Sequence, residues 1–161
     1  MVEENRLVFE FQPNERESLV SLLKCYPLPS QWNVELVRDD HKGEFEEDRQ
    51  FLEETLEAEK TAMVSGLNRF LESPSVFFED LPEEYLRIPL DQVDWFLQIL
   101  NDLRVSAWQL LGCPDQDEKQ ELEDMLKKEM PPEMMQRMQL FILLEMAGYY
   151  QSVVLDAVME R

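Results

Sequence analysis

The chain has 161 residues, of which 44% are hydrophobic and 31% are charged. This balance is too apolar for a disordered protein and too charged for a membrane protein, so we expect a single folded domain over residues 1–161. Fifteen Lys and Arg against 35 Asp and Glu leave a net charge of −20. Such a field repels phosphate groups, so we expect no direct binding to nucleic acid or to an anionic membrane.

Two segments of the sequence bear on the cellular location of the protein. The first six residues lack the basic flank and apolar stretch of a secretory signal or transit peptide, so we expect a cytoplasmic protein. The most apolar tract, residues 140–158, is interrupted by Glu145, Gln151 and Asp156. It falls short of the roughly 18 uninterrupted apolar residues of a membrane span, which predicts a core helix instead.

The first predicted element is a strand over about residues 6–11, because Leu7, Phe9 and Phe11 alternate with their neighbours. A helix is expected to follow, with Pro13 in its first turn and an end before Pro27. Its apolar stripe is formed by Leu19, Leu22 and Leu23. Residues 27–43, which include the polar run around His41, are predicted to form a loop.

Residues 44–72 are predicted to form the longest helix, ended by Ser73-Pro74. Its apolar positions are Phe45, Leu52, Leu56, Met63, Leu67 and Phe70. A rod of roughly 43 Å exceeds the diameter expected of this domain, so part of it should project or bend. The acidic half is expected to be solvated and to form a partner-binding face, for which the candidate residues are Glu46, Glu47, Glu53, Glu54 and Glu57.

A loop with Phe77 and Phe78 leads to a second strand at residues 86–90. Pro89 in that strand has no backbone N–H, which predicts an edge strand paired with the first one. Asp91 is expected to cap a helix over residues 92–111 that Gly112 ends. Since that helix is apolar on nearly all sides, we place it at the centre of the fold.

Two more helices are expected, over about residues 116–129 and 133–159, separated by Pro131-Pro132. The predicted fold class is therefore mainly α: a bundle of about five helices with a small two-stranded β pair.

Catalytic and metal-binding motifs are missing from the sequence. His41 is the single histidine and lies in a polar run, which argues against a nucleophile and base pair. There is no Glu-x-x-His pair for a di-iron site, no calcium loop and no glycine cluster for phosphate. Cys25 and Cys113 lack C-x-x-C spacing and are expected to be reduced thiols. We expect no cofactor and no metal.

Methionines near the Pro-Pro corner allow two interpretations, core filling or an adaptable groove for a partner helix. They are Met130, Met134, Met135, Met138 and Met146. The spacing of Met134, Met138 and Met146 fits the apolar stripe of the last helix. Met130 and Met135 lie nearer the corner, where exposure is easier.

Polar residues interrupt the apolar central helix at Asn101, Asp102 and Arg104. Arg104 is always charged and needs a carboxylate or an exit to water. Glu145, which is embedded in the apolar last helix, is the candidate partner. This cluster is predicted to be either a structural clamp between the two helices or a ligand or partner site.

The segment Trp95-Phe96-Leu97-Gln98-Ile99-Leu100-Asn101-Asp102-Leu103-Arg104, followed by Leu111-Gly112, resembles a motif of a bacterial family of uncharacterised single-domain proteins, a domain of unknown function. The terminal stretch Tyr149-Tyr150-Gln151-Ser152-Val153-Val154-Leu155 is similar too. The resemblance implies a short strand and helix, a long acidic helix and then the motif helix. It also implies a link to protein turnover, which favours a binding role over an enzyme.

We therefore expect a non-enzymatic interaction or adaptor protein that presents an acidic surface to a protein partner. The charge serves either solubility or the steering of a basic partner, and homo-oligomerisation is left open. One alternative is an enzyme that uses dispersed carboxylates and Arg104. Another is an inhibitor that mimics nucleic acid, which predicts regularly spaced rows of carboxylates.

Overall fold

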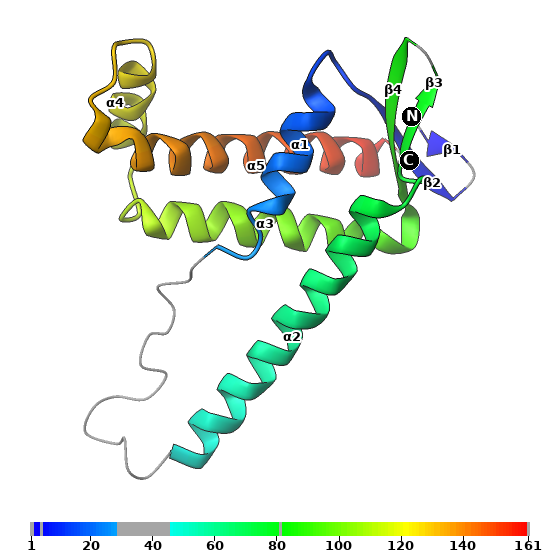
Figure 1. The fold of residues 1–161 in the computed structure, drawn as a ribbon, viewed down its shortest axis with the longest axis horizontal. Helices are drawn as coiled ribbons and strands as arrows, with labels where there is room; N and C mark the ends of the chain where they lie inside the picture. The colour runs from blue at the N-terminus through cyan, green and yellow to red at the C-terminus, as the bar shows by residue number, and fades with distance from the viewer. Residues whose placement is uncertain (1, 4, 29–45, 81, 161) are drawn as a thin grey trace.

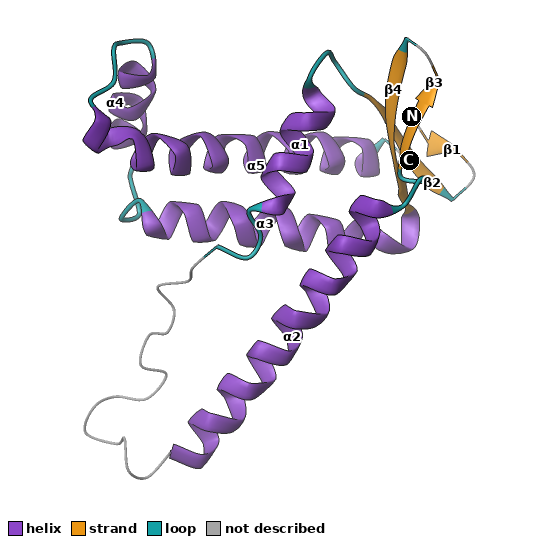
Figure 2. Ribbon diagram, viewed as in Figure 1, coloured by secondary structure: helices purple, strands orange, loops and turns teal. Residues whose placement is uncertain are grey.

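The computed structural model describes residues 2–3, 5–28, 46–80 and 82–160, so residues 29–43 of the predicted loop, with His41, and the acidic residue Glu44 lie outside the described residues. The described part is mainly helical, with five α-helices and a small antiparallel sheet (Figures 1 and 2). In chain order the elements are β1 (Val2–Glu3), β2 (Arg6–Glu10), α1 (Glu15–Lys24), α2 (Glu46–Glu72), β3 (Phe77–Asp80), β4 (Glu83–Pro89), η2 (Leu90–Gln92), α3 (Val93–Leu110), α4 (Gln116–Leu126), η3 (Pro132–Met134) and α5 (Met135–Met159). The predicted mainly α class is confirmed.

The antiparallel helices α3 and α5 lie side by side and form the centre of the molecule (Figure 1). Helix α1 crosses over this pair, α4 lies at one end and the sheet lies at the other (Figure 2). The interior of the pair is apolar: Phe96, Leu100 and Leu103 of α3 are fully buried, and α5 contributes Met138 and Ala147. The central position predicted for the motif helix is therefore correct.

The sheet is larger than predicted. Its order is β1-β2-β4-β3, and all neighbours are antiparallel. The expected pairing of β2 with β4 is present, with Leu7 opposite Ile88. The two-stranded pair is nevertheless wrong, because β3 adds a full strand and β1 adds two residues. The sequence predicts a loop at Phe77–Asp80, because this segment is short and does not alternate between apolar and polar residues.

Pro89 does not make β4 an edge strand, as its missing N–H had suggested. The strand lies between β2 and β3, and Pro89 is its last residue, opposite Arg6. At the end of a strand the lost donor removes no bond from the interior of the ladder. The next amide, of Leu90, donates to the carbonyl oxygen of Asn5 at 3.0 Å and keeps the pairing continuous.

The ends of the helices follow local chemistry with one correction. Asp91 does not cap α3; it lies in the 3-10 turn η2, and Gln92 is the N-cap residue. Gly112 ends that helix with a φ of 85°, a left-handed conformation that favours glycine. Asp115 caps α4 by accepting the amide of Glu118 at 2.8 Å.

Helix α2 projects from the body of the molecule (Figure 1). Its 27 residues span about 40 Å, and its buried side chains are Leu67 and Phe70, both near its C-terminal end. The ring of Phe70 packs 5.4 Å from the ring of Phe96 and 5.5 Å from that of Trp95. These ring contacts attach the C-terminal end of α2 to α3 and leave its N-terminal half outside the core.

The stretch Pro132–Met159 meets the length and hydropathy requirement for a membrane span, with a mean hydropathy of 1.2. Central helices of globular folds also satisfy this requirement. In this structure α5 packs against α3 more extensively than any other described pair of elements, and it contributes eight buried side chains.

Candidate functional site

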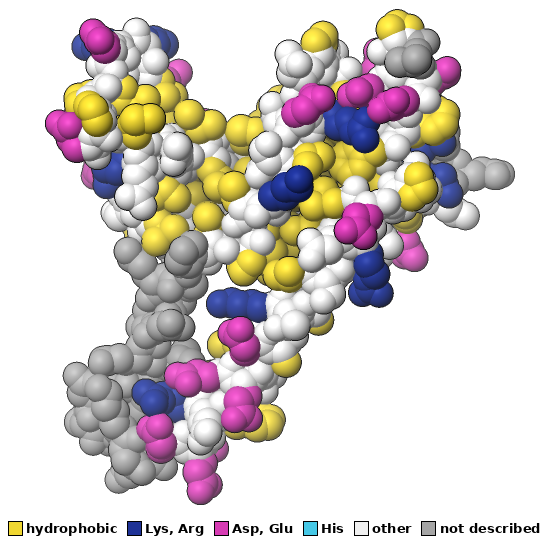
Figure 3. Space-filling model, in the orientation of Figure 1, with side chains coloured by type: hydrophobic (Ala, Val, Ile, Leu, Met, Phe, Trp, Pro, Cys, Tyr) yellow, Lys and Arg dark blue, Asp and Glu magenta, His cyan; other side chains and the backbone are white. Residues whose placement is uncertain are grey.

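The N-terminal half of α2, residues 46–59, is called the α2 arm below. Every side chain of the arm except that of Arg49 is exposed. Figure 3 shows carboxylates along it. They are Glu46, Glu47, Asp48, Glu53, Glu54, Glu57 and Glu59, which include all five predicted partner-face residues. The structure therefore places these five residues together on one projecting element.

The charge of the arm is only partly compensated from within. Arg49 forms ion pairs with Glu46 at 2.9 Å and with Glu53 at 3.8 Å, both along the same helix. Seven carboxylates against Arg49 and Lys60 leave residues 46–60 with a net charge of −5. Exposed pairs of this kind contribute little to stability. The arm therefore presents a negative field that a cationic partner can complement.

Apolar side chains also lie on the arm. Phe51 is 72% exposed, and Leu52 and Leu56, one helical turn apart, are 41% and 42% exposed. Leu52 and Leu56 are two of the predicted apolar positions of this helix and lie in its acidic half, which was expected to be solvated, whereas Phe51 was not among the predicted positions. The surrounding glutamates were the available signal, since an apolar side chain with acidic neighbours on both sides suits a surface better than a core.

The predicted polar cluster assembles differently from the predicted clamp. Arg104 donates from Nη2 to Oδ1 of Asn101 at 3.0 Å, and Gln151 of α5 donates from Nε2 to the same oxygen at 3.5 Å. Glu145 is exposed, and no ion pair joins it to Arg104. Asn101 therefore links α3 to α5 through Gln151, a residue that the sequence pattern does not indicate.

The helical phase of α5 explains this correction. Phe141, Leu144 and Ala147 are buried, whereas Ile142, Glu145 and Tyr149 form an exposed stripe. Gly148 leaves room for Arg104, whose Cδ would lie 3.8 Å from a Cβ added at that position. Nε of Arg104 is buried without a hydrogen-bond partner among the described residues. Arg104 thus lies across α5 at Gly148, away from the exposed stripe.

Asp102 belongs to a different part of the surface. It lines a small pocket of about 240 Å³ with Tyr26, Lys60 and Ser106, and Arg104 does not line this pocket. Burial raises the pKa of the Asp102 carboxyl above its usual value. Burial and the charge of Asp102 both raise the pKa of the Tyr26 hydroxyl, which donates to Sδ of Met63 at 3.3 Å. The predicted cluster is therefore divided over separate environments.

Several other predictions concern sulfur-containing side chains. Cys25 and Cys113 are free and exposed, as expected of unpaired thiols. Met138 is fully buried and Met135 is 51% exposed, in agreement with their predicted places. Met146 is half-buried on α5.

Among the described residues, no group of three His, Cys, Asp or Glu side chains is arranged to hold a metal ion.

Comparison with known proteins identifies the family. A family model described as Domain of unknown function (DUF2017) matches residues 35–158, which is most of the chain, so the protein belongs to this family. The predicted resemblance to an uncharacterised family is confirmed at that level. Neither a curated protein nor a solved structure matches the chain significantly.

Proposed function

We propose that this member of the DUF2017 family is a non-enzymatic adaptor that binds a basic protein partner on the α2 arm. The observation that carries the proposal is the exposed Phe51, Leu52 and Leu56 ridge between carboxylates on a helix that projects from the core. A projecting helix with an apolar ridge can pack against a helix or groove of a partner protein, and the flanking carboxylates favour a partner that carries positive charge.

The distribution of carboxylates favours binding over catalysis. An enzyme that used dispersed acids would bring them together with Arg104 in a concave site. Arg104 instead hydrogen-bonds to Asn101, and the carboxylates of the arm are spread along an exposed helix. A mimic of nucleic acid would not need the apolar ridge. The ridge and the charge together are what a docking face for a protein requires.

The chemistry of the partner follows from the arm. Residues 46–60 carry a net charge of −5, and the whole chain carries −20, so the partner is expected to present Lys or Arg around an apolar surface. A second copy of the chain would meet like charges on this surface. The link to protein turnover implied by the family resemblance makes components of that machinery the first partners to examine.

Affinity capture from the source organism with matched variants tests the proposal. Phe51→Ser with Leu56→Ser removes two of the three apolar side chains of the ridge, and Met159→Ser is the control, because Met159 is 76% exposed at the C-terminal end of α5. We expect the partner captured by the parent protein to be lost with the ridge variant and retained with the control. Retention by both variants would overturn the α2 arm as the docking face.

Charge variants provide an independent measurement on the purified partner. Glu53→Gln, Glu54→Gln and Glu57→Gln are combined in one variant, and a control carries Glu118→Gln, Glu121→Gln and Glu123→Gln on the exposed face of α4. Steering weakens as the Debye length falls to about 3 Å at 1 M salt. The association rate constant should fall with salt for the parent and the control, and much less for the arm variant. An association rate constant that does not change with salt concentration in any of the three proteins would contradict the proposal.

A further inference from the structure

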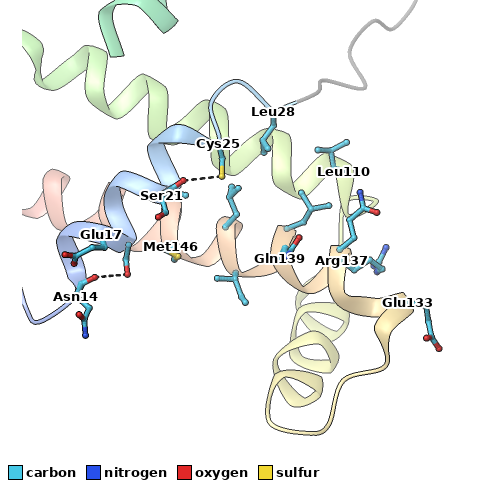
Figure 4. Close-up of a pocket in the computed structure, with 16 residues that line it drawn as sticks. Asn14, Glu17, Ser21, Cys25, Leu28, Leu110, Glu133, Arg137, Gln139 and Met146 are labelled. Carbon is cyan, nitrogen blue, oxygen red and sulfur yellow. Dashed lines mark hydrogen bonds between the residues drawn. The ribbon is translucent and has the colours of Figure 1, made fainter. Parts of the chain in front are cut away.

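A large groove lies between α1 and α5, on a part of the molecule separate from the α2 arm. Its volume is about 1070 Å³. Helix α1 forms one wall, α5 forms the floor, and Leu110 with η3 closes the far end (Figure 4). The space-filling view shows apolar side chains in the hollow between α1 and α4 (Figure 3).

The floor of the groove is apolar and its rim is polar. Leu22 of α1 and Leu143 of α5 reach it from the core, Ile142 is 41% exposed, and Met146 is half-buried. Exposed polar side chains stand along the edges, among them Glu17 on α1 and Glu133 on η3 (Figure 4). An apolar floor with a polar rim is the arrangement of protein-binding surfaces.

We propose that this groove binds an amphipathic helix of a partner protein, with Leu, Ile, Phe or Met toward the floor and Lys or Arg toward the rim. The groove is open along its length, so any occupant keeps one face in water. An amphipathic helix satisfies both conditions because its apolar residues recur at i, i+3, i+4 and i+7. Met146 suits such a role, since its flexible side chain adapts to different apolar partners.

Charge complementarity selects the polar face of the occupant. Glu17 and Glu133 are exposed at opposite ends of the groove (Figure 4), and the chain as a whole carries a net charge of −20. Among the described residues that line the groove, Arg137 is the cation, and its Nη2 donates to the carbonyl oxygen of Leu111 at 3.4 Å. The α2 arm of a second copy also carries exposed apolar side chains, but its carboxylates would meet the carboxylates of Glu17 and Glu133 at the groove. A basic helix of another protein is the better fit.

Two exposed thiols provide a reporter and a control within the same chain. Cys25 lines the groove and Cys113 does not, and both are free. The probe is a synthetic helix of roughly 16 residues, about 24 Å long, with Leu on one face and Lys on the other. We expect this peptide to slow alkylation of Cys25 by iodoacetamide, read by mass spectrometry, and to leave Cys113 unchanged. Equal rates at Cys25 with and without the peptide would overturn the proposal.

A matched pair of variants locates the contact. Ile142 and Leu155 lie on α5 with nearly equal exposure, 41% and 42%, and only Ile142 lines the groove. Ile142→Gln should weaken binding of the fluorescent peptide by about tenfold, the loss expected when one buried apolar contact is removed, and Leu155→Gln should not. Circular dichroism checks that both variants fold. Equal affinities of the two variants would overturn the assignment.

Control peptides and an arm variant separate the other outcomes. If a peptide with the same Leu and Lys residues in scrambled order protects Cys25 equally well, the occupant need not be an amphipathic helix, and the proposal is overturned. If a peptide with Glu in place of Lys protects Cys25 equally well, the proposed basic face of the occupant is overturned. Self-association of the parent in sedimentation velocity that Ile142→Gln abolishes would assign the groove to a second copy instead. Phe51→Ser with Leu56→Ser should leave protection of Cys25 intact, so the groove and the α2 arm can fail independently.

Discussion

Arg104 on α3 donates a hydrogen bond from Nη2 to Oδ1 of Asn101, one turn earlier on the same helix, at 3.0 Å. Because Gln151 of α5 donates to the same oxygen at 3.5 Å, Asn101 is the acceptor that joins the two central helices. Asn101→Ala leaves both donors without this acceptor in a half-buried place. We expect a loss of about 1–2 kcal/mol in the free energy of unfolding, measured by urea denaturation.

Glu145 provides the matched control for this prediction. It is exposed on α5 and makes no ion pair with Arg104, so Glu145→Gln should change the free energy of unfolding by no more than about 0.5 kcal/mol. A loss of about 3 kcal/mol or more with Glu145→Gln would instead indicate the clamp that the sequence suggested, because breaking a buried pair leaves an uncompensated charge.

Two glycines should respond in opposite directions to the same substitution. Gly148 lies inside α5, and a Cβ there would be at ordinary contact distance, 3.8 Å, from Cδ of Arg104. Gly148→Ala should therefore stabilise the protein by about 0.5–1 kcal/mol through helix propensity. Gly112 has a φ of 85°, so Gly112→Ala should destabilise it by a similar amount or more. Thermal unfolding of both variants checks the pair; a shift of the same sign in both would contradict it.

How far the sequence predicts the fold depends on whether the information is local. All five helices and the pairing of β2 with β4 follow from periodicity and from local breakers such as Gly112. β3 was missed because its four residues, Phe77–Asp80, lack alternation. The strand β4 was wrongly predicted to lie at the edge of the sheet, because the local sequence does not reveal that Pro89 is its last residue.

The candidate sites depend on contacts between distant segments, which a single sequence does not encode visibly. Glu145 seemed buried because its neighbours are apolar, yet a shift of one residue along α5 turns a side chain from α3 toward solvent. The groove draws Leu22, Leu110 and Ile142 from three helices, so no single pattern indicates it. The acidic face of α2 was accessible to prediction because its residues are consecutive.

Asp102 should make stability depend on pH in a definite direction. Burial raises the pKa of its carboxyl in the folded protein, so the protonated form is favoured there. The stability that this group contributes is present below its unfolded pKa and is lost as the pH rises through the folded value. Asp102→Asn should therefore stabilise the protein more at pH 7 than at pH 3, as measured by urea denaturation at both values. Equal effects at both pH values would contradict this assignment.

The α2 arm should open independently of the core, and its amide hydrogens should show this. Residues 46–59 bury no side chain, whereas Leu67 and Phe70 further along the same helix are 2% and 4% exposed. An isolated helix of about 14 residues is marginal in water, so the arm depends on the anchored end of α2 for its order. Local opening of the arm then requires far less free energy than unfolding of α3 or α5.

Hydrogen exchange followed by mass spectrometry measures this difference. Peptides from residues 48–59 should exchange orders of magnitude faster than peptides from Val93–Leu110, with residues 64–72 in between. Phe70→Ala, which removes the ring packed against Phe96 and Trp95, should speed exchange in residues 64–72 and change the arm little. Protection of the arm equal to that of α3 would show that it is packed rather than projecting. Protection that rises in the arm alone on addition of the captured partner would place the contact on the arm, because a bound partner suppresses the local opening of the backbone that it covers.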